Sequence, residues 1–209
     1  MTFISGEFES GISSLYSELS ESSWTGKNKR VTRILKKHSF EPPDRTFLPP
    51  LNHYAYLKEP DGNKKIVGYT EASRGCKHLC RHCPVVPVYG GQFRVVPADV
   101  VLADVEAQAR RGAEHITFGD ADFFNGIGHA MRVVDGLARG RLGLTYDVTI
   151  KVEHLLKHTH HLETLARTGC LFVTTAVESV DDRTLNILDK GHTRNDFIRL
   201  VLGCKIFKI

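Results

Sequence analysis

Short stretches of strand-forming residues alternate with stretches of helical periodicity from about residue 64 onward, and this order restricts the fold more than any other feature. The expected strands are residues 66–70, 115–118, 144–152 and 170–177, and the expected helices are residues 97–112, 128–139 and 154–167. The glycines that follow the helices, Gly112, Gly140 and Gly169, are typical of helix C-caps. Strands separated by helices of this length predict an α/β fold with right-handed βαβ units, in which a parallel sheet forms a barrel or part of one.

The third expected strand alternates strictly between polar and apolar residues. The polar set is Thr145, Asp147, Thr149 and Lys151, and the apolar set is Tyr146, Val148, Ile150 and Val152. A period of two places each set on its own face of the sheet. Both faces of a helix-covered parallel sheet are usually buried, so we expect the polar face to point into an open barrel that holds a polar ligand. The alternative is a polar face that points outward to solvent.

Three cysteines, Cys76, Cys80 and Cys83, follow the first expected strand within eight residues. Thiolates are the ligands that hold iron-sulfur clusters, and a closed cluster takes four of them. The other two cysteines, Cys170 and Cys204, lie far downstream. The triplet therefore predicts a cluster with one iron left open for another ligand.

Zinc is the alternative for this loop, because His78 and His82 lie inside it and Cys3His zinc sites are common. Zinc ribbons and fingers usually pair two separated short spacings, and the second half is missing here. A disulfide is the weakest reading, since an odd triplet in a chain without a secretion signal leaves one thiol over.

Composition places few limits on this chain. Its 209 residues, 41% hydrophobic, suffice for one large domain with a core, and the net charge is +4. No apolar stretch approaches the eighteen or so residues that cross a membrane, and the N-terminus lacks the pattern of a signal peptide. We therefore expect a protein of the reducing cytoplasm that has no membrane partner.

The first 63 residues are predicted to form an N-terminal extension and linker, and residues 64–209 the domain. Apolar residues at helical spacing predict an amphipathic helix over residues 7–20. The basic segment 27–37 is interpreted as a solvated helix face, with phosphate contact as the alternative. Two Pro-Pro pairs, in 41–44 and 48–51, predict a linker.

The cysteine loop and its surroundings resemble the radical S-adenosylmethionine (radical SAM) superfamily over roughly residues 64–196. Three segments, Tyr69–Cys76, Cys83–Gly91 and Ile116–Phe123, resemble more closely the subgroup described as CUAEP/CCAEP-tail radical SAM proteins. The tail that names this subgroup is absent here. The resemblance implies a partial (β/α) barrel of six strands.

The resemblance also implies cofactors and a mechanism. Cys76, Cys80 and Cys83 would bind three irons of a 4Fe-4S cluster, and the amino and carboxylate groups of S-adenosylmethionine (SAM) would chelate the fourth. An electron from a flavodoxin- or ferredoxin-type donor would cleave SAM to methionine and a 5'-deoxyadenosyl radical, which abstracts hydrogen from a substrate that the sequence does not identify. Two alternatives remain: transfer of a 3-amino-3-carboxypropyl group on the same cluster, and a zinc-stabilised nucleic-acid-binding module. Nucleic acid is the less expected partner.

The segment Gly119–Asp122 stands where the family holds the methionyl amino group, at the carboxyl end of the second expected strand. Gly119, Asp120 and Asp122 are the candidates, because a carboxylate can accept hydrogen bonds from an ammonium group. The family pattern of two glycines and a glutamate is not met here, so either aspartate remains possible. An ordinary Asx turn is the alternative.

Four further SAM contacts are implied by position alone. Glu178 and Ser179 match the place where ribose hydroxyls are often bound, although Ser179 also fits the cap of a helix at Asp181-Asp182. Lys151 would meet the SAM carboxylate or the substrate, or else pair with Glu153 or Asp147. His82 stands where the family often has an aromatic residue near the adenine.

The C-terminal part of the chain is short for this family. After the fourth expected strand we predict a helix cap at Lys190–Thr193, a helix over residues 195–202, and a stub from Cys204 that begins a fifth strand. Four to five strands instead of six indicate an incomplete, truncated barrel with an exposed sheet edge.

Overall fold

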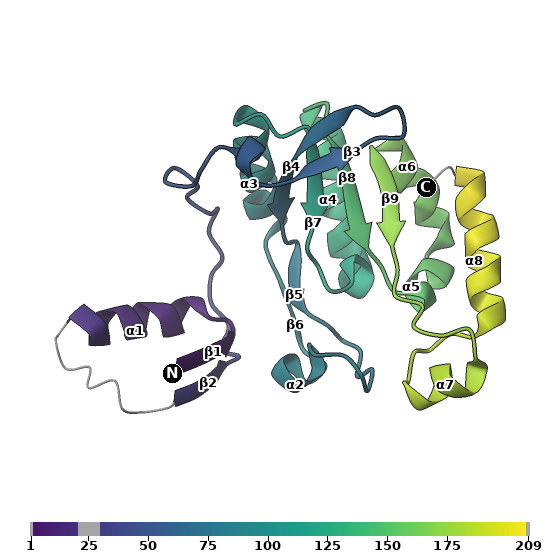
Figure 1. Ribbon diagram of the computed structural model, residues 1–209, viewed down its shortest axis with the longest axis horizontal. Coiled ribbons are helices and arrows are strands. Elements are labelled where there is room, and N and C mark those ends of the chain that lie inside the picture. Colours follow the sequence, from purple (N-terminus) through teal and green to yellow (C-terminus); the bar gives the residue numbers. More distant parts are fainter. Residues whose placement is uncertain (1, 21–29, 208–209) are drawn as a thin grey trace.

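The computed structural model describes residues 2–20 and 30–207 (Figure 1). Its main sheet has five strands in the order β3-β4-β7-β8-β9. They are β3 (Tyr56–Lys58), β4 (Lys64–Thr70), β7 (His115–Phe118), β8 (Thr145–Thr149) and β9 (Cys170–Thr174). Strand β3 pairs antiparallel with β4, and the other pairs are parallel. The four predicted parallel strands are therefore confirmed, and β3 is an addition.

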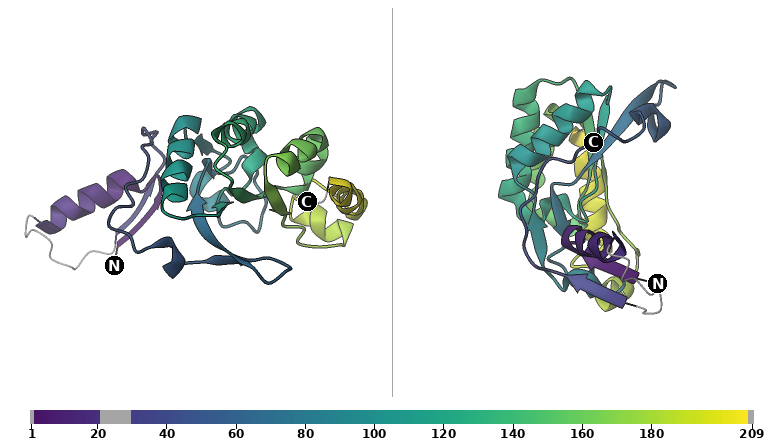
Figure 2. Two further views of the ribbon diagram at one scale, coloured as in Figure 1. Left: turned by 90° about the horizontal axis from the view of Figure 1, so that it is seen from above. Right: turned by 90° about the vertical axis from the view of Figure 1, so that its left-hand side faces the viewer.

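Helices cover one face of this sheet, which curls around its open face (Figure 2). They are α3 (Ala98–Arg110), α4 (Ile127–Gly140), α5 (Val152–Lys157), α6 (Leu162–Arg167) and α8 (Arg194–Phe207). The core lies between sheet and helices, where Tyr146, Val148 and Ile150 of the β8 segment are almost fully buried. The architecture is the predicted partial (β/α) barrel.

The polar residues of β8 point to the other face, and they are not exposed to solvent. Asp147 is buried and accepts hydrogen bonds from Thr117 Oγ1 (2.6 Å) and from His115 Nε2 (2.8 Å). His115 Nδ1 also lies 2.8 Å from Thr145 Oγ1. The inner face of the sheet is thus polar, as the alternation predicts, and the outward-facing alternative is wrong.

The predicted helix 154–167 is interrupted. Helix α5 ends at Lys157, and the short 3-10 helix η3 (Thr159–His161) separates it from α6. His158 leaves the helical region with φ −122°, and Thr159 Oγ1 donates to the Leu156 carbonyl at 2.9 Å. A hydroxyl that bonds to the preceding turn competes with the helical pattern, which explains the break.

The predicted strand-like stub from Cys204 is wrong, because α8 continues through Phe207. Phe197, Leu200 and Cys204 recur at helical spacing and pack against the core beside α5 and α6. This packing stabilises the helix over the alternating pattern that suggested a strand. Residues 208 and 209 lie outside the described part of the chain.

The N-terminal segment contains β1 (Thr2–Gly6), α1 (Glu9–Ser20) and β2 (Arg30–Ile34), in which β1 and β2 pair in parallel. The predicted helix is confirmed from Glu9 onward, but neither strand was predicted. In the described part of the basic segment, residues 30–37, Arg30–Ile34 form a strand and the rest has no regular structure, so the interpretation as a helix face is wrong there. Arg33 Nη1 donates to the Pro87 carbonyl at 2.9 Å and is held within the molecule. Lys27 and Lys29 lie outside the described residues.

The division of the chain at residue 63 stays a prediction. The linker contains the 3-10 helix η1 (Leu51–His53), and β3 precedes the boundary although it belongs to the main sheet. Within residues 2–20 and 30–207, no helix combines the length and apolar character that a membrane span requires.

Candidate functional site

The cysteine loop grows from a small hairpin that was not predicted. Strands β5 (Ser73–Gly75) and β6 (Phe93–Val95) pair antiparallel, and the loop between them contains α2 (Val86–Tyr89). The Cys76 amide donates to the Gln92 carbonyl at 3.2 Å and closes the base of the loop. Gly75 has φ +78°, and a Cβ at this position would lie 2.5 Å from the Gln92 carbonyl oxygen. Glycine is required here for the two strands to approach.

The three thiols of the loop are free, with Cys80 buried and Cys76 and Cys83 half-buried. Burial raises the pKa of the Cys76 thiol. Its Sγ lies 3.7 Å from Asn125 Oδ1, which also accepts a hydrogen bond from the Lys77 amide at 3.2 Å. Asn125 belongs to the 3-10 helix η2 (Phe123–Gly126), so the loop after β7 holds the first cysteine in place.

The two aspartates of the loop after β7 have different surroundings. Both oxygens of the buried Asp120 are occupied, since Oδ1 accepts from Ser73 Oγ (2.6 Å) and Oδ2 from the Ala72 amide (2.9 Å). Burial raises the pKa of Asp120 to about 6. Asp120 therefore anchors β5 to the end of β7.

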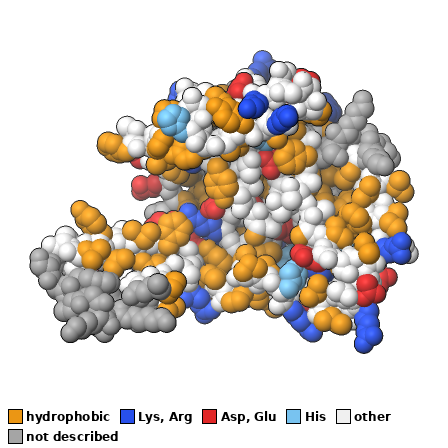
Figure 3. Space-filling view, viewed as in Figure 1, with side chains coloured by type: hydrophobic (Ala, Val, Ile, Leu, Met, Phe, Trp, Pro, Cys, Tyr) orange, Lys and Arg blue, Asp and Glu red, His pale blue; other side chains and the backbone are white. Residues whose placement is uncertain are grey.

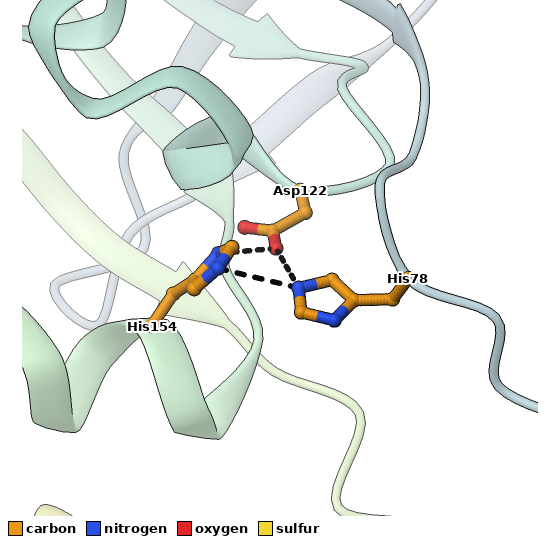
Figure 4. A group of neighbouring side chains, drawn as sticks. All are labelled: His78, Asp122 and His154. Atoms are coloured by element: carbon orange, nitrogen blue, oxygen red, sulfur yellow. Dashed lines mark hydrogen bonds and ion pairs between the residues drawn. The ribbon is translucent and has the colours of Figure 1, made fainter. Parts of the chain in front are cut away.

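Asp122 is also buried, but only one of its carboxylate oxygens accepts hydrogen bonds. Oδ1 caps η2 by accepting from the Phe124 amide at 3.2 Å. Oδ2 lies 2.6 Å from His154 Nδ1 and 3.7 Å from His78 Nε2 (Figure 4). Among the described residues, no group donates a hydrogen bond to Oδ2. Asp122 Oδ2 thus lies in ion-pair contact with His154 beside the cysteine loop, and its hydrogen-bonding capacity is unused by the described residues.

Lys151 lies at the start of α5, at the edge of the same cluster. Its Nζ donates to Glu153 Oε2 (2.9 Å) and to His78 Nδ1 (3.0 Å). The sequence suggested Glu153 or Asp147 as the ion-pair partner of Lys151. The structure has Glu153 in this place, whereas Asp147 binds His115. Burial lowers the pKa of His78, and the nearby charge of Lys151 lowers it further.

His82 and Glu178, two residues singled out for different parts of SAM, contact each other. His82 Nε2 lies 2.9 Å from Glu178 Oε1, and this hydrogen bond lowers the pKa of Glu178. The buried Lys190 approaches the same oxygen at 3.5 Å. Ser179 Oγ accepts from the Asp181 amide at 3.0 Å in a turn that precedes α7 (Asp182–Ile187), and Asp181 itself caps this helix.

These residues meet because they follow four neighbouring parallel strands. The cysteine loop follows β4, the Gly119 loop follows β7, Lys151 follows β8 and Glu178 follows β9. Ligands of open α/β sheets bind at this carboxyl edge. Sequence reasoning did not assign roles to His154 and Lys190. The spacing of His154 from Lys151, one helical turn, is a signal that could have found it.

A cavity with a volume of about 490 Å³ lies between the N-terminal segment and the sheet. It is lined by residues that include Phe8, Arg45, Tyr69 and Arg74. Figure 3 shows the corresponding face, which is indented between the N-terminal segment and the sheet. Gly119 and Ala121 line this cavity as well, so it reaches the loop that contains Asp122.

Proteins similar to this chain in sequence include a methyltransferase and a tRNA-modifying synthase. The bacteriochlorophyllide d C-12(1)-methyltransferase of Chlorobaculum tepidum is 29% identical in an alignment of 191 residues that covers 88% of this chain and 39% of that protein. The tRNA-2-methylthio-N(6)-dimethylallyladenosine synthase of Methylococcus capsulatus is 25% identical over 179 residues, covering 74% of this chain and 35% of that protein. The chain thus spans little more than a third of either relative.

Solved structures share the fold. The radical S-adenosylmethionine methyltransferase TsrM from Kitasatospora setae superimposes with a TM-score of 0.56 at 23% identity, over 68% of this chain and 29% of TsrM. Apo OxsB, a cobalamin-dependent S-adenosylmethionine radical enzyme, gives a TM-score of 0.62 at 16% identity, over 96% of this chain and 30% of OxsB.

The family model of the Radical SAM superfamily matches residues 70–205, which include the cysteine loop and the loops after β7, β8 and β9. This segment is more than half of the sequence. The chain therefore belongs to the radical SAM superfamily, a family of enzymes that use a 4Fe-4S cluster and S-adenosylmethionine.

Proposed function

We propose that Cys76, Cys80 and Cys83 bind three irons of a 4Fe-4S cluster and that the chain cleaves SAM reductively on it. The observation that carries the proposal is a loop with three free thiols that faces Asp122, whose Oδ2 is buried and accepts no hydrogen bond from the described residues. When bound, the cluster and SAM supply an electron and a 5'-deoxyadenosyl radical that abstracts hydrogen from a substrate.

In this structure the three thiols are not gathered as closely as a single zinc ion requires. Tetrahedral zinc with Zn–S bonds of about 2.3 Å would hold three sulfur atoms roughly 4 Å apart. Within the described part of the chain, the groups of possible ligand atoms that lie within 4.8 Å of one another do not include these three cysteines. The zinc-stabilised nucleic-acid module is disfavoured accordingly.

The residues around the thiols fit the polar parts of SAM. Asp122 Oδ2, which accepts no hydrogen bond from the described residues, would accept one from the amino group, whereas Asp120 is occupied and would position Gly119 and the loop. Lys151 would bind the SAM carboxylate if it leaves Glu153. His82 and Glu178 would contact adenine and ribose from their shared position, and Ser179 would support them through the turn before α7.

The test is anaerobic reconstitution with iron and sulfide, followed by SAM, a reductant and analysis of the products. 5'-Deoxyadenosine supports the proposal, and methylthioadenosine supports 3-amino-3-carboxypropyl transfer instead. Cys80→Ala should abolish either product, because two thiolates do not hold a cluster with one open iron. Cys204→Ala, on α8 far from the loop, is the matched control and should retain the product. Stoichiometric zinc without a cluster would refute both readings.

Methyl transfer is a second candidate, favoured by the similarity to the Chlorobaculum tepidum methyltransferase. It predicts S-adenosylhomocysteine among the products. The physiological reductant would be of the flavodoxin or ferredoxin type, and the reducing cytoplasm would be the location. The similarity does not identify the substrate, because the chain covers only 39% of that relative.

A further inference from the structure

We propose that His78, Asp122 and His154 form a binding site for one divalent transition-metal ion, separate from the three cysteines. The ligand atoms are His78 Nε2, Asp122 Oδ2 and His154 Nδ1, which come from the cysteine loop, the loop after β7 and helix α5 (Figure 4). The three ligand atoms lie within 4.8 Å of one another.

The closest contact in this group is not a hydrogen bond. Asp122 Oδ2 and His154 Nδ1 are 2.6 Å apart and buried, yet neither has a hydrogen-bond partner among the described residues. A buried carboxylate oxygen and a ring nitrogen that meet only as an ion pair, with no hydrogen bond, are costly unless a further group satisfies them. A cation that accepts both lone pairs would remove this cost.

The donor set indicates the class of ion. Two imidazoles and one carboxylate suit Fe²⁺, Zn²⁺ or Co²⁺, and three protein ligands leave positions open for water or a substrate. The site is shielded, since the side chains of Asp122, His154 and His78 are 2%, 12% and 19% exposed. Hard ions such as Mg²⁺ prefer oxygen ligands and are not expected to bind here.

Lys151 and Glu153 would form the outer shell of the site. With the ion on Nε2, His78 carries its proton on Nδ1, so Lys151, now 3.0 Å away, must withdraw. Glu153 Oε2 lies 4.0 Å from Nδ1 and would move closer to accept a hydrogen bond from this N–H. Loss of such an outer-shell carboxylate typically weakens metal binding about 10- to 100-fold. Glu153→Gln should therefore lower the affinity for the metal ion without removing a ligand.

The ion and the amino group of SAM would compete for the same oxygen of Asp122. The metal site does not depend on the proposed function, because its three ligands need neither the cluster nor SAM. Competition follows only if both assignments hold. A second acidic group, Glu7, Glu9 and His38, already contains the guanidinium of Arg74 and is less suited to a cation.

The experiment is an anaerobic Co²⁺ titration of the full chain in which Cys76, Cys80 and Cys83 are replaced by alanine. Histidine and carboxylate ligands give d–d absorption without the charge-transfer band of thiolate ligation. We expect one bound ion of this kind. Asp122→Asn, added to this background, should weaken binding at least tenfold while Oδ1 still caps η2. His154→Gln should do the same.

The matched control is His160→Gln, an exposed histidine of η3 in the same segment. It should leave the affinity unchanged, and so should Glu9→Gln in the acidic group. The proposal is overturned if the folded triple variant binds no ion. It is also overturned if Asp122→Asn and His154→Gln bind Co²⁺ as tightly as the triple variant does. If the triple variant does not fold, the same titration of the cluster-reconstituted protein decides, with circular dichroism as the check of folding. Competition between SAM and Co²⁺ is then measured as a change in Co²⁺ affinity, independently of whether SAM is cleaved.

Discussion

Asp120 and Asp122 stand two residues apart in one loop, yet their carboxylates have different surroundings. Asp120 is satisfied by Ser73 and Ala72, and burial raises its pKa to about 6. Asp122 keeps one buried oxygen free of hydrogen bonds from the described residues. Identical side chains in one loop thus separate into an anchor and a candidate ligand.

The raised pKa of Asp120 predicts a pH dependence of stability. An acid whose folded pKa lies above the unfolded value of about 3.9 favours the folded state below that value, and this contribution is lost as pH rises through about 6. Relative to Asp120→Asn, wild type should therefore lose up to about 3 kcal/mol between pH 4 and pH 7. Urea unfolding of both proteins across this range measures it. Parallel profiles would contradict the prediction.

Gly119 is fixed by a close approach rather than by backbone conformation. A Cβ at this position would lie 1.7 Å from Tyr69 Oη. Gly119→Ala should lower the free energy of unfolding by about 1–3 kcal/mol, as overpacking does. Gly128→Ala, where a Cβ meets nothing within 4 Å, is the control. If the phenol is the cause, Tyr69→Ala should relieve the cost in the double variant.

At the scale of elements, α8 depends on the cap that precedes it. Thr193 Oγ1 accepts from the Asp196 amide at 3.2 Å, and Asp196 Oδ2 accepts from the Thr193 amide at 2.9 Å. This reciprocal arrangement is a capping box. Thr193→Ala should cost about 1 kcal/mol in urea unfolding. The exposed Asn195→Ala should change stability by no more than about 0.5 kcal/mol, and an equal loss in both would argue against the cap.

At the scale of the whole molecule, Arg74 joins the N-terminal segment to the cysteine hairpin. Its guanidinium pairs with Glu9, with Glu71 (3.0 Å) and with Glu7 (3.5 Å), and it lies over the rings of Phe8 and Phe40. Glu7 is only 2% exposed. Removal of the cation would leave this carboxylate buried without its partner.

Arg74→Ala should therefore lower the free energy of unfolding by about 3–5 kcal/mol, measured with urea. Arg110→Ala, which loses an exposed pair with Glu106 at 3.8 Å, should cost no more than about 1 kcal/mol. Similar losses in the two variants would mean that the Arg74 network is no more than a surface network.

Much of the fold could be predicted because its signals are local. Residue periodicity predicts the parallel strands and their order along the chain. It also predicts α3 and α4, together with the glycines that follow these helices. Strands β1, β2, β5 and β6 were missed because each has only three to five residues and is defined by its partner. The residue 63 boundary and the closer subgroup resemblance stay predictions.

By itself, the sequence determined the cysteine triplet, the polar face of β8 and the radical SAM resemblance, because each depends on residue type and spacing alone. Only the tertiary structure decided which side chains meet. His82 and Glu178 are 96 positions apart, and His78 and His154 are 76 apart. These contacts form because parallel strands bring successive loops to one edge of the sheet, and side-chain direction in a loop depends on packing that no local pattern encodes.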